Sequence, residues 1–178
     1  MLKLTYICIA LLYISLGLSS ELPKGLIDIY LGQSYKNLKQ KYQIKKIASY
    51  DNISKTYEVI YTDNSEMRTL ISFFNSKVFK ITLIYSENFL NDTEWESIYN
   101  QAIINYGIPT NIYLEKQNNT TKEHYIWEDE NLKHTYVRII EDGKLRNFYI
   151  ILTDKKIEEK INNLSPLKKL YYKIVGLF

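Results

Sequence analysis

The segment DTEWESIYNQAIINYGIP, residues 92–109, predicts one complete amphipathic helix around which the rest of the chain is arranged. Thr93 and Glu96 have the spacing of a capping box, in which two side chains satisfy backbone N–H groups at the start of a helix. Four apolar residues then recur at the helical period and predict one buried face: Trp95, Ile98, Ala102 and Tyr106.

The same segment also marks the end of the helix. Gly107 is placed to adopt the left-handed conformation that follows many helices, and Ile108 is expected to make the closing apolar contact. Pro109 cannot continue a helix because it has no backbone N–H. We therefore expect the helix to stop just before Gly107.

Alternating apolar residues predict antiparallel strands on both sides of this helix. Before it, Ser34 caps a short helix at 35–42, and strands are expected at 26–31, 45–50, 56–62, 67–74 and 78–85. In the last of these, one core-facing row is predicted: Phe79, Ile81, Leu83 and Tyr85. After the central helix, strands are expected at 111–115, 123–127, 133–140 and 145–152, with an exposed loop at 117–122.

Two turn signals complete the pattern. Asp142-Gly143 predicts a tight hairpin. Asp154 is placed to cap a terminal helix with Ile157, Ile161 and Leu164 on one face. The order helix, sheet, helix, sheet, helix predicts an α+β fold of two diverged helix-plus-antiparallel-sheet repeats with a C-terminal helix. Its expected parts are a signal peptide (1–20), a first repeat (21–90), a second repeat (91–153) and a C-terminal amphipathic helix (154–178).

Three short motifs carry a resemblance to a known class of protein: LGQSYKNLKQKY (31–42), YGIP (106–109) and the lone Trp127 in a strand. They resemble the Leu-Gly-x-Ser and Tyr-Gly-x-Pro…Trp patterns of small bacterial envelope modules, such as beta-lactamase-inhibitor-protein-like and SmpA/OmlA-like domains. The resemblance implies helices packed on an antiparallel sheet. It also implies a non-catalytic protein that acts by binding other proteins.

Residues 1–20, MLKLTYICIALLYISLGLSS, have the composition of an export signal. Lys3 supplies a positive charge, residues 4–16 are apolar, and small residues follow at Gly17, Ser19 and Ser20. We expect cleavage after Ser19 or Ser20 and a periplasmic or secreted protein. The alternative is an uncleaved N-terminal anchor, because the apolar run is close to the length that spans a bilayer.

Composition excludes several chemistries. Cys8 is the only cysteine, so the chain without its signal has no thiol nucleophile, thiolate zinc site or disulfide. The net charge is only +3, and arginine, the residue best suited to bidentate phosphate and base contacts, occurs only at Arg68, Arg138 and Arg146. A nucleic-acid partner is therefore disfavoured. No G-x-S-x-G, phosphate-binding or dinucleotide motif is present, so no cofactor is expected.

The histidines His124 and His134 are the residues on which an enzymatic alternative depends. They lie on neighbouring predicted strands near several carboxylates: Glu123, Glu128, Asp129 and Glu130. Two histidines and a carboxylate that faced one another could bind a metal or act in a small hydrolase. The other interpretation is that both are ordinary strand residues and that 128–131 is a hairpin turn. No catalytic, cofactor-binding or metal-ligating residue is assigned.

The segment 166–178 carries more apolar residues than a free helix in water would: Leu167, Leu170, Tyr171, Ile174, Val175, Leu177 and Phe178. Lys168, Lys169 and Lys173 lie between them. The segment is expected either to pack on the protein or a partner, or to lie at an anionic membrane surface.

Together these patterns favour an exported, non-catalytic protein-binding module of inhibitor, assembly-factor or adaptor type, with an unknown protein partner. The alternatives are a small hydrolase or metal-binding protein using His124 and His134, and a peripheral membrane-surface protein using its C-terminal helix.

We predict that export removes residues 1 to about 19 or 20, because small residues follow the apolar run at a position that suits signal peptidase. N-terminal sequencing of the protein purified from its native host should begin at Ser20 or Glu21. A sequence that begins at Met1 would show that the segment is retained as an anchor.

Overall fold

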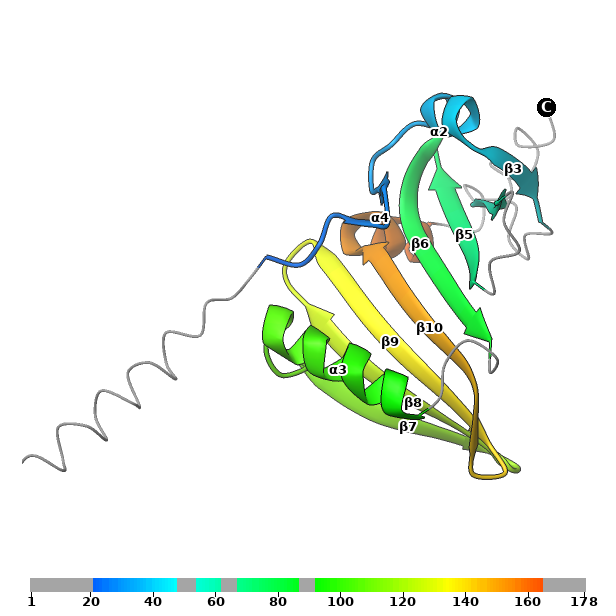
Figure 1. Ribbon diagram of the computed structural model, residues 1–178. Helices are drawn as coiled ribbons and strands as arrows, with labels where there is room; N and C mark the ends of the chain where they lie inside the picture. Colours follow the sequence, from blue (N-terminus) through cyan, green and yellow to red (C-terminus); the bar gives the residue numbers. More distant parts are fainter. Residues whose placement is uncertain (1–20, 48–53, 62–66, 87–91, 165–178) are drawn as a thin grey trace, which may run out of the picture.

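The computed structural model describes residues 21–47, 54–61, 67–86 and 92–164. The predicted signal peptide (1–20) and most of the C-terminal segment (165–178) therefore lie outside the described residues. So does the side chain of Thr93, and with it the predicted capping box. The described chain has an α+β fold in which helices pack on a large antiparallel sheet (Figure 1). Within it, no helix is both long and apolar enough to cross a membrane.

Eight strands form the large sheet, in the order β3-β4-β5-β6-β10-β9-β8-β7. Their bounds are β3 (Gln43–Lys46), β4 (Lys55–Ile60), β5 (Met67–Phe74), β6 (Lys77–Ser86), β7 (Asn111–Gln117), β8 (Thr120–Glu128), β9 (Leu132–Glu141) and β10 (Lys144–Asp154). All neighbours are antiparallel. The pair β6–β10 joins two four-stranded meanders into one continuous sheet, with Leu83 opposite Ile150 at its middle. The two edges of the sheet are β3 and β7.

The helices cover different faces of this sheet. The helices α2 (Tyr35–Lys41) and α3 (Asp92–Tyr106) both contribute to the main core, through Leu38 and through Trp95 with Ala102. The helix α4 (Lys155–Asn162) instead packs Ile161 against Phe74 and Phe79. Because Phe73 belongs to the main core and adjacent strand residues point to opposite faces, α4 lies on the other face.

Local sequence signals explain where the helices begin and end. The Ser34 hydroxyl accepts a hydrogen bond from the backbone N–H of Asn37, and the Asp154 carboxylate accepts one from Ile157, as predicted for caps. Gly107 has a φ of 77° and donates its N–H to the carbonyl of Ile103 at 2.8 Å, which confirms the predicted end of α3. The Asp142-Gly143 turn is confirmed too, with both residues at positive φ.

The tryptophans join α3 to the sheet. The helical period predicts burial of Trp95, and the large apolar area of the side chain predicts burial of Trp127 on the sheet that the helix covers. Trp95 is 3% exposed and Trp127 is 1% exposed. Four rings surround that of Trp95, at centroid distances of 4.8 to 6.5 Å: Tyr99, Tyr125, Tyr136 and Phe148. The guanidinium of Arg138 lies 5.2 Å from the Trp95 ring. This aromatic cluster fixes the helix over β8, β9 and β10.

The expected strand at 26–31 is wrong. The chain instead forms a hairpin of two very short strands, β1 (Gly25–Leu26) and β2 (Ile29–Tyr30). Ile27, in the turn that joins them, has a φ of 58°. Left-handed backbone is unfavourable for a β-branched residue, so contacts elsewhere must hold the turn. The Asp28 carboxylate provides them, because it accepts hydrogen bonds from Lys41 and Tyr42 at the end of α2.

The predicted row on β6 holds for three of its four residues. Ile81, Leu83 and Tyr85 belong to the main core, but Phe79 packs with Phe74 under α4. The reason is a β-bulge, because Ser72 pairs with Lys80 whereas the next residue, Phe73, pairs with Val78. An extra residue in one strand reverses the alternation beyond it.

The exposed loop expected at 117–122 is also wrong. β7 and β8 run on to a turn of only two residues, Asn118 and Asn119, and Asn118 has a φ of 53°. Asparagine tolerates this left-handed conformation well. The Asn119 side chain also donates to the Asp142 carboxylate at 2.9 Å, which links the tips of two hairpins.

The cluster around Trp95 predicts a large stability cost for its removal. Trp95→Ala should lower the free energy of unfolding by about 3 to 5 kcal/mol, because it leaves a cavity between α3 and the sheet. Ile104→Ala is the control, since Ile104 is 76% exposed on the same helix and should cost less than about 0.5 kcal/mol. Urea unfolding of both variants measures the difference. A change below about 1 kcal/mol for Trp95→Ala would contradict its structural role.

Candidate functional site

The histidine His134 is a core residue. It is 1% exposed, and neither ring nitrogen has a hydrogen-bond partner among the described residues. Three aromatic rings surround it, those of Tyr106, Trp127 and Tyr136. Burial disfavours the charged ring and lowers the pKa of His134 to about 4. The side chain is therefore neutral at pH 7 and has no access to a ligand.

His124 lies on the opposite face of the sheet. It pairs with Val137, whereas His134 pairs with Trp127, and these registers place the two histidines on opposite sides. The His124 ring stacks on Tyr113 at a centroid distance of 4.3 Å, and its Nε2 lies 3.7 Å from a Glu115 carboxylate oxygen. Burial lowers the pKa of His124, and Glu115 opposes that shift only in part. The structure therefore does not bring the two histidines into one site.

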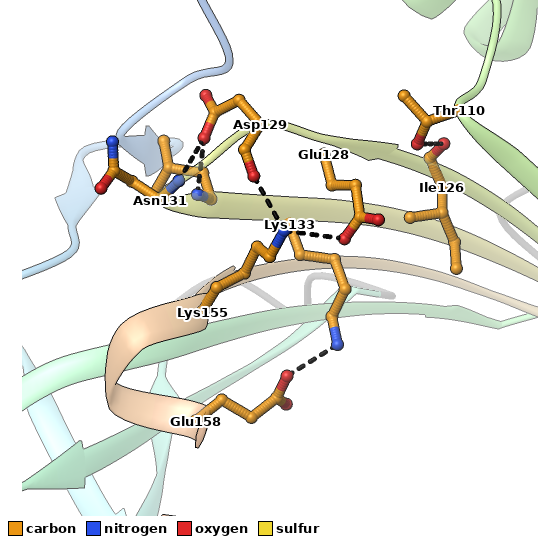
Figure 2. Close-up of polar contacts among 9 residues, drawn as sticks. Thr110, Ile126, Glu128, Asp129, Asn131, Lys133, Lys155 and Glu158 are labelled. Atoms are coloured by element: carbon orange, nitrogen blue, oxygen red, sulfur yellow. Dashed lines mark hydrogen bonds and ion pairs between the residues drawn. The ribbon is translucent and has the colours of Figure 1, made fainter. Parts of the chain in front are cut away.

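The acidic turn after β8 is held by lysines (Figure 2). Asp129 accepts hydrogen bonds from the backbone N–H groups of Asn131 and Leu132, both at 2.7 Å. Lys155 at the start of α4 donates to the carbonyl of Asp129 at 2.8 Å and pairs with Glu128 at 3.2 Å.

A second ion pair, between Lys133 and Glu158 at 2.6 Å, ties β9 to α4 (Figure 2). The carboxylates at 128–130 are therefore used in hydrogen bonds within the turn and in ion pairs with its lysines. No group of three metal-ligating side chains occurs within the described ranges. The interpretation of 128–131 as a hairpin turn is confirmed.

An unexpected feature lies at the sheet edge after α3. The indole N–H of Trp127 donates to the carbonyl of Gly107 at 2.7 Å, and the hydroxyl of Thr110 donates to the carbonyl of Ile126 at 2.9 Å. These two bonds fix both ends of the short connection to β7. Ile108 lies between them and is 81% exposed, so the predicted closing contact of Ile108 is wrong. A fixed connection therefore holds an apolar side chain in solvent.

The edge strand β7 continues this apolar surface. All seven of its residues are exposed, among them Ile112 (51%), Tyr113 (40%) and Leu114 (57%). Ile112 lies opposite Tyr125, whose ring contacts Trp95, so Ile112 and Leu114 point to the α3 side of the sheet and Tyr113 to the other. We call Ile108, Ile112, Tyr113 and Leu114 the edge surface.

The backbone of β7 adds a second kind of binding group. β8 pairs with β7 on one side, and no further strand lies beyond it in the part of the chain that the structure describes (Figure 1). Every second residue of an edge strand directs its N–H and C=O groups outward, where another strand can bond them. The edge surface thus combines apolar side chains with unpaired backbone donors and acceptors.

A hollow of about 660 Å³ lies at the tip of the β7–β8 hairpin. Its lining is polar and carries charges of both signs: Glu115, Lys116, Gln117, Asn118, Asn119, Thr120, Lys122 and Glu141. No buried ionisable group belongs to it, so it has the character of an open surface depression rather than a catalytic cleft.

Sequence reasoning missed the edge surface. The signal was present, since Ile112-Tyr113-Leu114 is a run of three apolar residues rather than an alternating pattern, and such a run cannot be buried on one face only. The sequence does not show the order of the strands in the sheet. These residues lack a neighbouring strand only because theirs is the outermost one.

Burial of His134 predicts an acid-sensitive fold. Its pKa is about 4 in the folded state and near 6.5 when unfolded, so the unfolded chain binds more protons between these values. The free energy of unfolding should therefore fall as the pH drops through this window, by roughly 2 kcal/mol from pH 7 to pH 5. His134→Phe should remove that part of the pH dependence, whereas His124→Phe should remove less. Urea unfolding at both pH values measures it, and an unchanged dependence in His134→Phe would refute the assignment.

Comparisons with known proteins do not show a family for this chain. No family model matches the chain, and no curated protein matches it. Among solved structures it is similar to a cysteine-rich secretory protein from Staphylococcus aureus subsp. aureus Mu50, with a TM-score of 0.46 and 13% sequence identity. The match covers 78% of this chain and 50% of that one, so the chain spans about half the length of that protein.

Proposed function

We propose that this protein is an exported, non-catalytic protein-binding module that binds its partner through the edge surface. The observation that carries the proposal is the exposure of Ile108, Ile112, Tyr113 and Leu114 beside an unpaired strand edge. Grouped apolar side chains on a surface favour contact with another macromolecule, since each would otherwise remain hydrated.

The chemistry of this surface suits a protein better than other ligands. Backbone N–H and C=O groups of an edge strand bond another strand, and the side chains beside them provide specificity. The nearby charges, Glu115 and Lys116, have opposite signs, so the surface does not attract a polyanion. This local charge balance adds to the low net charge and the scarcity of arginine, which already disfavour a nucleic-acid partner.

A tandem duplication is part of the proposal. Each half of the sheet is a four-stranded antiparallel meander preceded by one helix, α2 or α3, and the strand order runs outward in both directions from β6–β10. Two copies of one unit placed about that pair would produce this order. The proposed units are 21–90 and 91–153, followed by the C-terminal segment 154–178.

Export rests on residues 1–20, with a periplasmic or secreted protein as the proposed outcome and an uncleaved anchor as the alternative. Membrane-surface contact through 166–178 also remains a proposal from the sequence, because that segment lies outside the described residues. The hydrolase or metal-binding alternative is not proposed, since His124 and His134 lie on opposite faces of the sheet.

The proposal predicts which substitutions abolish binding. The exported chain, tagged and incubated with its native envelope or medium, should capture protein that an Ile112→Lys/Leu114→Lys variant does not. Ile104→Lys is the matched control, because it adds the same charge at an exposed isoleucine on α3, away from the edge. Capture is measured by mass spectrometry, and further copies of the chain itself count as protein captured. Equal capture by wild type and the double variant would refute the proposal.

A further inference from the structure

The edge strand β7 is self-complementary. When two identical strands pair antiparallel about a two-fold axis, the position of the axis along the strand decides which residues of the two copies lie opposite one another. With the axis at Tyr113, Ile112 lies opposite Leu114, and Tyr113 lies opposite itself. Ile112 and Leu114 share one face of the sheet, so this register gathers four apolar side chains on that face.

The same register avoids charge repulsion. Glu115 lies opposite Asn111, and Lys116 lies opposite Thr110, so no like charges oppose one another. An axis moved by one residue to Leu114 would place Lys116 opposite Ile112 and Glu115 opposite Tyr113. An axis at Glu115 would place two carboxylates together. Of these three registers, pairing about Tyr113 is the one that joins apolar side chains and opposes no like charges.

The sheet's other edge has the features of a protected one. β3 is only four residues long, and both Lys45 and Lys46 are exposed on it. Short length and lysines are devices that keep sheet edges from pairing, because two copies would bring their charges together. β7 has seven residues and exposes three adjacent apolar side chains. The contrast indicates that one edge is closed to pairing and the other is open.

Within the described residues, the side chains of β7 on the α3 face of the sheet are half exposed and can contact a second copy. The rings of α3 contact rings on β8, β9 and β10: Tyr125, Trp127, His134, Tyr136 and Phe148. The side chains of Ile112 and Leu114 are 51% and 57% exposed on the same face.

We infer that β7 binds β7 of a second copy of this chain, antiparallel and about Tyr113, so that two eight-stranded sheets join into one. The inference rests on the proposed binding function of the edge surface and names its partner. Two-fold pairing of identical surfaces is the commonest form of protein self-association. The contact is small, so a dissociation constant of about 1–100 μM is expected.

Single cysteines test the register directly. In a Cys8→Ser background, an introduced cysteine is the only one in the chain whether or not residues 1–20 are removed. Opposed residues on antiparallel strands have Cα atoms about 4.5 to 5.5 Å apart, within the range of a disulfide. Tyr113→Cys should therefore form a disulfide dimer under mild oxidation, at least about tenfold faster than Lys45→Cys on the protected edge.

Two further variants locate the axis. Ile112→Cys mixed with Leu114→Cys should yield the mixed dimer in preference to either homodimer, because these residues oppose one another in the inferred register. Faster cross-linking of Leu114→Cys alone than of Tyr113→Cys would overturn the register. Equal and slow cross-linking of the Tyr113→Cys and Lys45→Cys variants would overturn the pairing itself.

Sedimentation of the cysteine-free chain gives an independent measurement. The dimer fraction should rise with protein concentration. The Ile112→Lys/Leu114→Lys variant should raise the dissociation constant at least about tenfold, because it removes apolar contacts and adds charge repulsion between the copies. Ile104→Lys should leave it unchanged. A monomer at all concentrations, with edge-dependent capture of another protein intact, would refute self-pairing and leave the proposed function standing. Loss of both would refute the proposed function as well.

Discussion

The hydrogen bond from the Trp127 indole to the carbonyl of Gly107, at 2.7 Å, fixes the geometry of the second half of the chain. It joins the end of α3 to β8, the strand next to the edge strand β7, and the Trp95 cluster holds the start of the same helix. An indole N–H buried without an acceptor would be costly, so Trp127 and the left-handed Gly107 require each other. The connection to β7 therefore leaves the helix in one direction only.

The direction in which this connection leaves α3 explains why the edge surface is exposed. Because the connection is held at Gly107 and Thr110, the side chain of Ile108 does not close the helix and remains 81% exposed. Apolar side chains that would be core residues in an inner strand remain in solvent here. The same bonds that stabilise the fold thus create the surface to which we assign binding.

The two halves of the sheet depend on each other through β6 and β10. These central strands carry buried residues on the helix face, including Ile81, Leu83, Phe148 and Leu152. Their pairing makes one core from two meanders, and the larger core buries a greater share of the chain than either meander could bury alone. α4 closes the opposite face near the acidic turn. Its Ile161 packs there, its Lys155 pairs with Glu128, and its Glu158 pairs with Lys133 of β9.

Sequence alone determined what depends on neighbours along the chain. The cap at Ser34, the end of α3 at Gly107, the Asp142-Gly143 turn and the burial of both tryptophans follow from local periodicity and from residues with special backbone freedom.

Tertiary structure decided what depends on neighbours in space. The reversal at Phe79 comes from a bulge set by the pairing of β5 with β6, and the hairpin at Ile27 comes from the contacts of Asp28 with a later helix. The pairing register of β8 with β9 placed the histidines on opposite faces, and strand order left β7 at the edge. Alternation along a strand specifies two faces but not which strand lies beside it, so whether Ile112 and Leu114 are core or surface was decided only by the assembled sheet.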